Sequence, residues 1–445
     1  MRTGIQRHPQ AGAAAAWSGD CIADHPRRRS LQALQRALTQ TTEVLARELG
    51  RPGAQAPQWS ETEWAVARAV AAIHGVSPLL AGTLRWRGPP SWSRFLELQT
   101  VHTAQRFLRI QRLLQLIDAR AREADIPAVA LKGAALHALG IYAAGERPMA
   151  DIDLLVRPEQ SAAFARLLAS VGYTETHRTW KHRVFRGADD ADPAALGEHA
   201  DNSIKIELHC RIAEVLPRRA VDLTRIVFPE TPRPGLNGYR SKAALLLHLL
   251  LHNAGALVLR EGRLLQLHDI ARLAAVMSAA DWEELSLQAR HTAEGSLWWA
   301  FPPLALANRY FGCVPDPVLR RAAADCHWTL RGVYRRRTLA RASLSHLWIS
   351  AFPGIEWTRS LGAVLAYAAA RVVPDRETLE GRQALARVQP RVSGGSWSQL
   401  SQGRRIVRWI LARPARHETL QPVQAALRGA QRPLGSQPLR ATSSS

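Results

Sequence analysis

Apolar and polar residues alternate in two short stretches of a chain that otherwise shows helical spacing. Residues 151–156 (DIDLLV) and 203–209 (SIKIELH) place polar side chains at every second position, as strands with one buried face do. A short apolar run at 129–131 predicts a third strand. A helix is expected directly after it, over 134–142. The pattern therefore predicts a small sheet inside a mostly helical protein.

Helical periodicity accounts for most of the remaining sequence. The long run at 95–124 is expected to form the longest helix before the sheet, with Arg106, Arg109 and Arg112 on its solvated face. Residues 174–202 are polar and irregular and predict a hairpin with a mobile loop, or a solvated excursion. Asp281 is expected to cap a helix. The other predicted helices cover 31–49, 60–73, 158–170, 241–259, 264–277, 281–288, 296–310 and 361–373.

These elements predict an α+β fold, a small mixed sheet with flanking helices and a C-terminal helical domain. The breaker cluster at 232–235 (PRPG) is expected to be a domain linker. The expected segments are a disordered leader (1–30), an N-terminal helical segment (31–100), the sheet-containing core (101–235), a helical domain (240–349) and a basic, partly disordered C-terminal region (350–445).

Composition adds charge to this picture. The formal net charge is +22, yet only four of the 59 basic residues are lysines, a skew typical of base-composition bias. Nucleic-acid binding is permitted but lacks a recognisable motif, and scattered solvated arginines are the favoured interpretation. The four cysteines show neither zinc-ligand nor disulfide spacing, which favours the cytoplasm. No apolar run is expected to span a membrane.

The candidate chemistry lies on the alternating strands. Asp151 and Asp153 share one face of their strand, and Glu207 occupies the polar face of the later strand together with Lys205 and His209. Carboxylates brought close together repel each other, and Mg²⁺ bound through carboxylates and phosphates relieves that repulsion. We therefore predict a metal site at Asp151, Asp153 and Glu207. The alternative is an ordinary polar strand face in which Glu207 pairs with an arginine.

The turn between the first strand and its helix is a candidate phosphate site. Gly133 has no Cβ, so an anion can approach the main chain closely at the start of a helix, and Lys132 adds a positive charge. Arg147 lies four residues before Asp151 and is predicted to brace a phosphate or the aspartates. A structural partner for Arg147 is an equally open alternative.

Several histidines have weaker signals. His209 shares the face of Glu207, where it either serves the site or only bonds the sheet edge. His248 and His252 stand four apart on a predicted helix, a spacing that can grip a metal, but helix packing is the favoured role.

The order of these features resembles the polymerase-beta-type nucleotidyltransferase superfamily. More closely, ALKGAAL at 130–136, the DIDLLV and IELH strands, HDIARL at 268–273 and DWEEL at 281–285 resemble a bacterial family called uncharacterised nucleotidyltransferases. The resemblance covers roughly residues 100–290. One departure is Ala134, which stands where the superfamily usually has glycine or serine after Gly133. Asp269 matches the family's helical pattern and is expected to orient the second domain.

The resemblance implies transfer of an NMP group from ATP or another nucleoside triphosphate to an unknown protein, peptide or small-molecule acceptor. It implies two Mg²⁺ ions at Asp151, Asp153 and Glu207, with Glu207 either binding metal or accepting the acceptor's proton. Lys132, Gly133 and Arg147 would bind the nucleotide. The alternative is a non-catalytic nucleotide- or protein-binding module that keeps the fold, which Ala134 and the arginine-rich ends favour.

Overall fold

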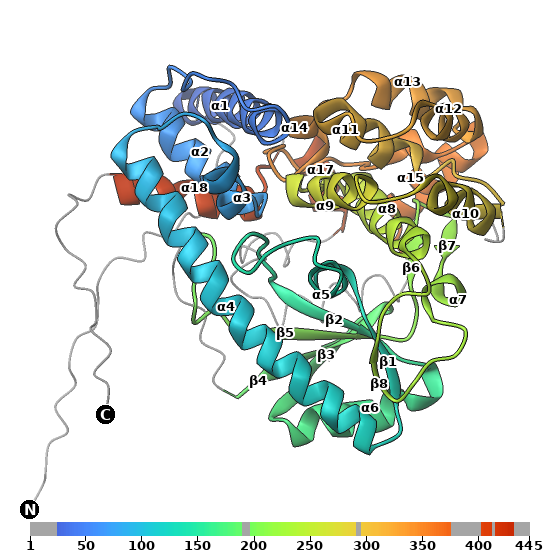
Figure 1. The fold of residues 1–445 in the computed structure, drawn as a ribbon. Helices are drawn as coiled ribbons and strands as arrows, with labels where there is room; N and C mark the ends of the chain where they lie inside the picture. Colours follow the sequence, from blue (N-terminus) through green and yellow to red (C-terminus); the bar gives the residue numbers. More distant parts are fainter. Residues whose placement is uncertain (1–24, 189–195, 291–294, 375–401, 412–413, 431–445) are drawn as a thin grey trace, which may run out of the picture.

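A computed structural model describes residues 25–188, 196–290, 295–374, 402–411 and 414–430. The α+β fold is confirmed: a mixed six-stranded sheet lies below a larger group of helices (Figure 1). One long helix, α4 (Pro90–Glu123), runs diagonally from the helical group to the far side of the sheet. The site described below lies where the sheet faces the helices.

The sheet has the order β3-β4-β5-β2-β1-β8. Its strands are β1 (Pro127–Ala130), β2 (Asp151–Leu155), β3 (Tyr173–Arg178), β4 (His182–Gly187), β5 (Lys205–His209) and β8 (Gly235–Asn237). Strand β2 runs parallel to β5 and antiparallel to β1. Apolar and polar side chains alternate along β2 and β5 because one face of each strand packs into a hydrophobic core, whereas the other face carries the charged residues of the site.

Three strands, β3, β4 and β8, lie where the sequence suggested a hairpin, a loop or a linker. The predicted hairpin forms as β3 and β4, and β4 pairs with β5, so this segment belongs to the sheet. The last residue of the predicted linker at 232–235, Gly235, begins β8, which pairs in parallel with β1. The domain boundary itself stays a prediction. Asp118 of α4 accepts the Leu236 N–H at 2.7 Å and holds this short strand in place.

The two faces of the sheet pack against different cores. Ile152 and Leu154 of β2 and Ile206 and Leu208 of β5 lie in a cluster beneath α4 and α6 (Ser161–Ser170). The opposite face meets the helical group through α5 (Lys132–Ala138) and α8 (Lys242–Leu259). Because side chains alternate across a strand, the polar residues of β2 share one face, as do those of β5, as predicted, and the structure turns this face toward the helical group.

The helical group combines segments from both ends of the described chain around one hydrophobic cluster. Its N-terminal helices are α1 (His25–Gly50), α2 (Glu61–Ile73) and α3 (Ser77–Thr83). Its later helices are α9 (Leu264–Ala274), α10 (Ala279–Arg290), α11 (Phe301–Phe311), α12 (Asp316–Asp325), α13 (Trp328–Arg336), α14 (Leu339–Ala342) and α18 (His417–Ala430). Helix α18 packs on α2, more than 340 residues earlier in the sequence.

The remaining elements are short or peripheral. They are η1 (Pro158–Gln160), β6 (Ala213–Val215), β7 (Ala220–Asp222), α7 (Thr224–Val227), η2 (Ile355–Trp357), α15 (Leu361–Val372) and α17 (Gln402–Leu411). Strands β6 and β7 form a separate hairpin. Residues 1–24 of the expected leader and most of the expected disorder after 374 lie outside the described residues. The last part of that leader, from His25, belongs to α1.

Two local predictions are wrong. Asp281 is not the N-cap residue of α10. It lies in the first turn and accepts the Ser278 N–H at 2.7 Å, while Ser278 Oγ accepts the Asp281 N–H at 3.2 Å. Ser278 is therefore the residue that caps the helix. Arg106 is the second case: Arg109 and Arg112 of α4 are exposed as predicted, but Arg106 is buried.

Helix α8 has the length and apolar composition of a membrane-spanning helix, which the sequence interpretation overlooked. About 78% of its apolar window is buried inside the protein. The bent pair α2–α3 passes the same test only if both helices are taken together. Burial of α8 between the sheet and the other helices is the arrangement of a core helix.

His74 joins four distant parts of the helical group. Its Nδ1 accepts the Leu264 N–H at 2.9 Å, and its Nε2 lies 2.9 Å from Ser345 Oγ, which also bonds Thr42 at 2.6 Å. The ring is fully buried. Burial, with a smaller effect of Arg263, lowers the pKa of His74 from 6.5 to about 3.

We expect His74 to make folding stability depend on pH. Between the folded pKa of about 3 and the unfolded pKa of 6.5, only the unfolded chain binds the proton. The contribution is therefore complete above pH 6.5 and decreases as the pH falls, by about 1.4 kcal/mol per pH unit. Urea unfolding at pH 7.5 and 5.5 should show about 1.4 kcal/mol less pH dependence for His74→Gln than for the unchanged chain. Equal pH dependence in both proteins would contradict this expectation.

Candidate functional site

The register of two parallel strands brings the predicted carboxylates together. Asp153 on β2 lies directly beside Glu207 on β5, and Asp151 lies beside Lys205. All four side chains belong to the face that meets the helical group. The Asp153 side chain is only 5% exposed and that of Glu207 12%, whereas Asp151 is 33% exposed. The strand face thus carries three acidic groups, with Asp151 the most accessible.

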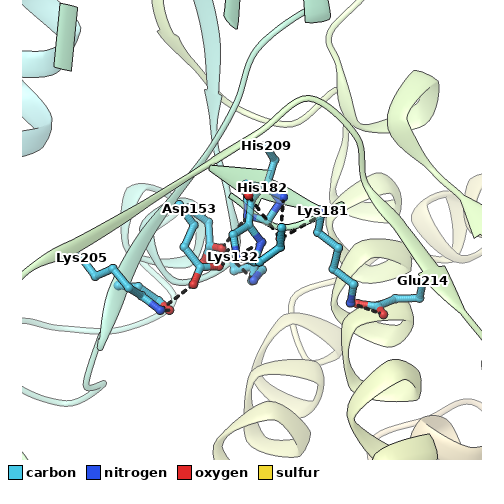
Figure 2. Close-up of polar contacts among 10 residues, drawn as sticks. Lys132, Asp153, Lys181, His182, Lys205, His209 and Glu214 are labelled. Carbon is cyan, nitrogen blue, oxygen red and sulfur yellow. Dashed lines mark hydrogen bonds and ion pairs between the residues drawn. The ribbon is translucent and has the colours of Figure 1, made fainter. Parts of the chain in front are cut away.

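Two lysines neutralise much of this negative charge (Figure 2). Lys132 Nζ lies 2.8 Å from Asp153 Oδ1. Lys205 Nζ lies 2.5 Å from Glu207 Oε1 and 3.4 Å from Asp151 Oδ2, so one ammonium group bridges two carboxylates. His209 Nε2 completes the contacts of Asp153, at 3.0 Å from Oδ1. Positive charge therefore already stabilises the carboxylates of this face.

The pKa values of the three acids diverge for physical reasons. Burial and the neighbouring Asp153 raise the pKa of Asp151. Burial alone would raise the pKa of Asp153, but Lys132 and His209 lower it well below its usual value. Burial and Asp153 likewise act to raise the pKa of Glu207, and the opposing charges of Lys205 and Lys132 lower it overall. Asp153 and Glu207 are ionised at neutral pH, as a cation site requires.

The turn at Lys132 has an unusual backbone. Lys132 adopts φ = 47°, a left-handed conformation that side chains other than glycine and asparagine rarely take. Its N–H donates to Tyr239 Oη at 3.1 Å, and Tyr239 Oη lies 2.6 Å from His248 Nδ1 of α8. This chain of contacts ties the turn to the helical group and directs the Lys132 side chain toward Asp153.

The space beside Gly133 is taken by a protein side chain. A Cβ at Gly133 would collide with the guanidinium of Arg147 and contact Met149. Close approach of Arg147 therefore explains why this position needs a glycine. The predicted phosphate contact of Gly133 remains a prediction, because the structure shows a protein group at that side of the turn.

Arg147 forms a buried double contact with Asp269 of α9. Arg147 Nε lies 2.8 Å from Asp269 Oδ1, and Nη2 lies 2.7 Å from Oδ2. Tyr142 Oη donates to the same carboxylate at 3.0 Å. These contacts join the loop before β2 to the helical group. The expected role of Asp269 in orienting the second domain stays a prediction. The predicted nucleotide contact of Arg147 stays a prediction.

A cleft of about 210 Å³ lies between β5 and α8. We call it the β5–α8 cleft. Of the three carboxylates, Glu207 is the one that lines it, together with Lys132, His182 and His209 on the sheet side. His248, His252 and Gly255 line it on the α8 side. Burial lowers the pKa of His248 and of His252 well below the usual value, so both rings are neutral at physiological pH.

Sequence reasoning missed Arg106. Its guanidinium donates to the carbonyl oxygens of Met149, Ala150 and Ser203 at 3.0, 3.0 and 2.7 Å. These carbonyls lie just before β2 and β5, so one buried arginine aligns the starts of both carboxylate-bearing strands. Three arginines at helical spacing give no sign of which one turns inward.

His182 was also missed as a site residue. It lies opposite His209 in the antiparallel pair of β4 and β5, with the ring centroids 4.9 Å apart. The predicted hairpin contained His182, but only its pairing with β5 could bring the ring to the site.

Comparison with protein families supports the resemblance. The model of a family described as uncharacterised nucleotidyltransferase matches residues 60–312, more than half of the chain. The match includes β1, β2, β5 and the helices α8 and α9. Comparison with curated proteins finds no match, and none is found among solved structures.

Proposed function

Because the chain belongs to the uncharacterised nucleotidyltransferase family, we propose that it transfers an NMP group from a nucleoside triphosphate to an acceptor at the β2–β5 face. The observation that carries this proposal is the register that sets Asp153 beside Glu207, with Asp151 two residues earlier on the same face. We include in the proposal a relationship of the core to the polymerase-beta-type superfamily. Protein, peptide and small-molecule acceptors are all compatible with it.

The donor set fits the magnesium ions that the proposal requires. Asp151, Asp153 and Glu207 offer carboxylate oxygens, which Mg²⁺ prefers, and the ammonium group of Lys205 already occupies a cationic position between Asp151 and Glu207. When bound, Mg²⁺ would activate the acceptor hydroxyl and neutralise charge on the phosphates. Two ions held by these three residues remain the expected stoichiometry.

The chain's own groups have separate tasks in this proposal. Lys132 keeps Asp153 ionised. Because Lys132 stands in the turn itself, its charge would also attract a phosphate there. Lys205 offsets the repulsion between Asp151 and Glu207, and it must move aside if a metal takes the same oxygens. Glu207 either binds metal or accepts the proton of the acceptor.

Incubation of the full chain with Mg²⁺ and each α-labelled nucleoside triphosphate, in turn, tests the proposal directly. A cell extract from which small molecules have not been removed supplies possible acceptors. The matched control is the Asp151→Asn/Asp153→Asn double variant, which keeps the shape of both side chains. Label transferred by the unchanged chain alone would support the reaction and identify the acceptor class. Equal labelling by the double variant would refute it.

A non-catalytic nucleotide-binding module is the second candidate. Two observations favour it: Ala134 provides no hydroxyl after Gly133, and lysines occupy carboxylate oxygens that a metal would need. This candidate predicts saturable binding of a nucleoside triphosphate without product, and binding that survives Asp151→Asn. A nucleotidyltransferase, by contrast, forms product with the unchanged chain and loses turnover in Asp151→Asn.

A further inference from the structure

Three possible metal ligands converge on the sheet side of the β5–α8 cleft. They are His182 of β4 and Glu207 and His209 of β5. Each offers one ligand atom, and these atoms all lie within 4.8 Å of one another. Figure 2 shows His182 and His209 side by side above Lys132 and Asp153. The set differs from the three carboxylates because it contains two imidazoles.

The distances within the set match the spacing of ligands around one metal ion. His182 Nδ1 lies 3.6 Å from Glu207 Oε2, and His209 Nε2 lies 3.8 Å from the same oxygen. Both distances are too long for hydrogen bonds. Two ligands that each bind Zn²⁺ at about 2.1 Å in tetrahedral geometry stand about 3.4 Å apart. Small side-chain adjustments would therefore bring all three ligand atoms onto one ion.

A second observation also points to a ligand. His182 Nδ1 is buried, and it has no hydrogen-bond partner among the residues that the structure describes. A buried polar atom without a partner is costly, so it calls for an explanation. The lone pair of a neutral imidazole nitrogen is a metal ligand. A metal bound at Nδ1 would satisfy this atom.

Glu207 has one oxygen to spare for such an ion. Lys205 Nζ contacts Oε1 at 2.5 Å, whereas Oε2 faces the two histidines. Ligation through His209 Nε2 would replace its hydrogen bond to Asp153 and requires the tautomer with the proton on Nδ1.

We propose that His182, Glu207 and His209 bind one divalent transition-metal ion, with Zn²⁺ or Mn²⁺ favoured over Mg²⁺. Imidazole nitrogen suits first-row transition metals, whereas Mg²⁺ selects oxygen ligands in octahedral geometry. The proposal shares Glu207 with the proposed transferase site, but binding of the metal does not depend on that reaction. The ion would lie in the β5–α8 cleft, where a substrate can reach it.

Calorimetric titration of the chelator-treated full chain, without a polyhistidine tag, tests this site. Zn²⁺, Mn²⁺ and Mg²⁺ are titrated in turn at pH 7.5. One saturable site per chain is expected for Zn²⁺, with weaker binding of Mg²⁺. His182→Asn should weaken Zn²⁺ binding by at least about tenfold. Losing a residue that only hydrogen-bonds a metal ligand already costs about that much, and this variant removes a direct ligand. The matched control is His327→Asn at the start of α13, which should leave binding unchanged.

Three outcomes would overturn the proposal: no saturable site for Zn²⁺ or Mn²⁺, equal metal affinity in His182→Asn, or tighter binding of Mg²⁺ than of both Zn²⁺ and Mn²⁺. A His209→Asn variant tests a second proposed ligand independently, and it should also weaken Zn²⁺ binding. Thermal unfolding verifies that each variant is folded. Metal binding is separable from transfer. Zn²⁺ binding without labelled product would retain this site and reject the proposed reaction. Product formation together with unaltered Zn²⁺ affinity in His182→Asn would support the proposed reaction and reject this metal site.

Discussion

Asp153→Asn is expected to reduce nucleotidyl transfer by at least about 10²–10³-fold, the scale seen when one group that stabilises a transition state is removed. Asp153 is the most buried of the three carboxylates and contacts both Lys132 and His209. The amide keeps its shape but cannot carry the negative charge that holds a cation. Initial rates with saturating nucleotide and Mg²⁺ measure the effect. Turnover within about threefold of the unchanged chain would remove Asp153 from the reaction.

Folding must be measured separately in this variant, because the change leaves the Lys132 ammonium group, only 16% exposed, without its carboxylate partner. Asp151→Asn supplies a second test. Asp151 is one-third exposed and lies 3.4 Å from Lys205, so its loss should cost little stability while still reducing transfer. The control is Asp201→Asn, whose side chain is 81% exposed and which should leave the rate unchanged.

Asp269→Asn is expected to destabilise the protein by about 3–5 kcal/mol, the usual cost of leaving one partner of a buried ion pair uncompensated. The Arg147 and Asp269 side chains are only 9% and 3% exposed, and they form two short contacts. The asparagine retains one acceptor but loses the charge that balances the buried guanidinium. Guanidinium chloride unfolding at pH 7.5 gives the change in the free energy of unfolding.

The matched control for Asp269→Asn is Glu123→Gln. Glu123 pairs with Arg120 on the exposed side of α4, and the two side chains are 62% and 51% exposed. Surface pairs of this kind contribute about 0–1 kcal/mol, so this variant should unfold almost as the unchanged chain does. Equal stability of both variants would show that the Arg147–Asp269 contact does not hold the sheet to the helices. Replacing both partners, as Arg147→Met/Asp269→Leu, should restore part of the lost stability.

The carboxylate face could be predicted from the sequence because it depends on local rules. Alternation at Asp151 and Asp153 determines which side chains share a face, and the same rule applies to Glu207 and His209. The structure confirms this facing: Ile152 and Ile206 lie in the core beneath α4, and the acidic residues face the helices. The roles assigned to these residues in metal and nucleotide binding remain predictions.

The ion pairs of the site depended on distances that the sequence does not contain. Lys205 was expected on the polar face, but its bridge between Asp151 and Glu207 follows from the parallel register of β2 and β5. Arg106 shows the same limit. Its helical spacing matched that of Arg109 and Arg112, yet carbonyl oxygens from two separate loops make its burial possible.

The sequence by itself determined the α+β composition, the strand faces and the set Asp151, Asp153 and Glu207, because hydrophobic periodicity reports local burial. Tertiary structure alone decided that β8 completes the sheet, that Arg147 pairs with Asp269 and that His182 meets Glu207 and His209. The physical reason is that these contacts join segments from about 25 to about 120 residues apart along the chain. Such contacts form only when strand register and helix packing set the distances between side chains.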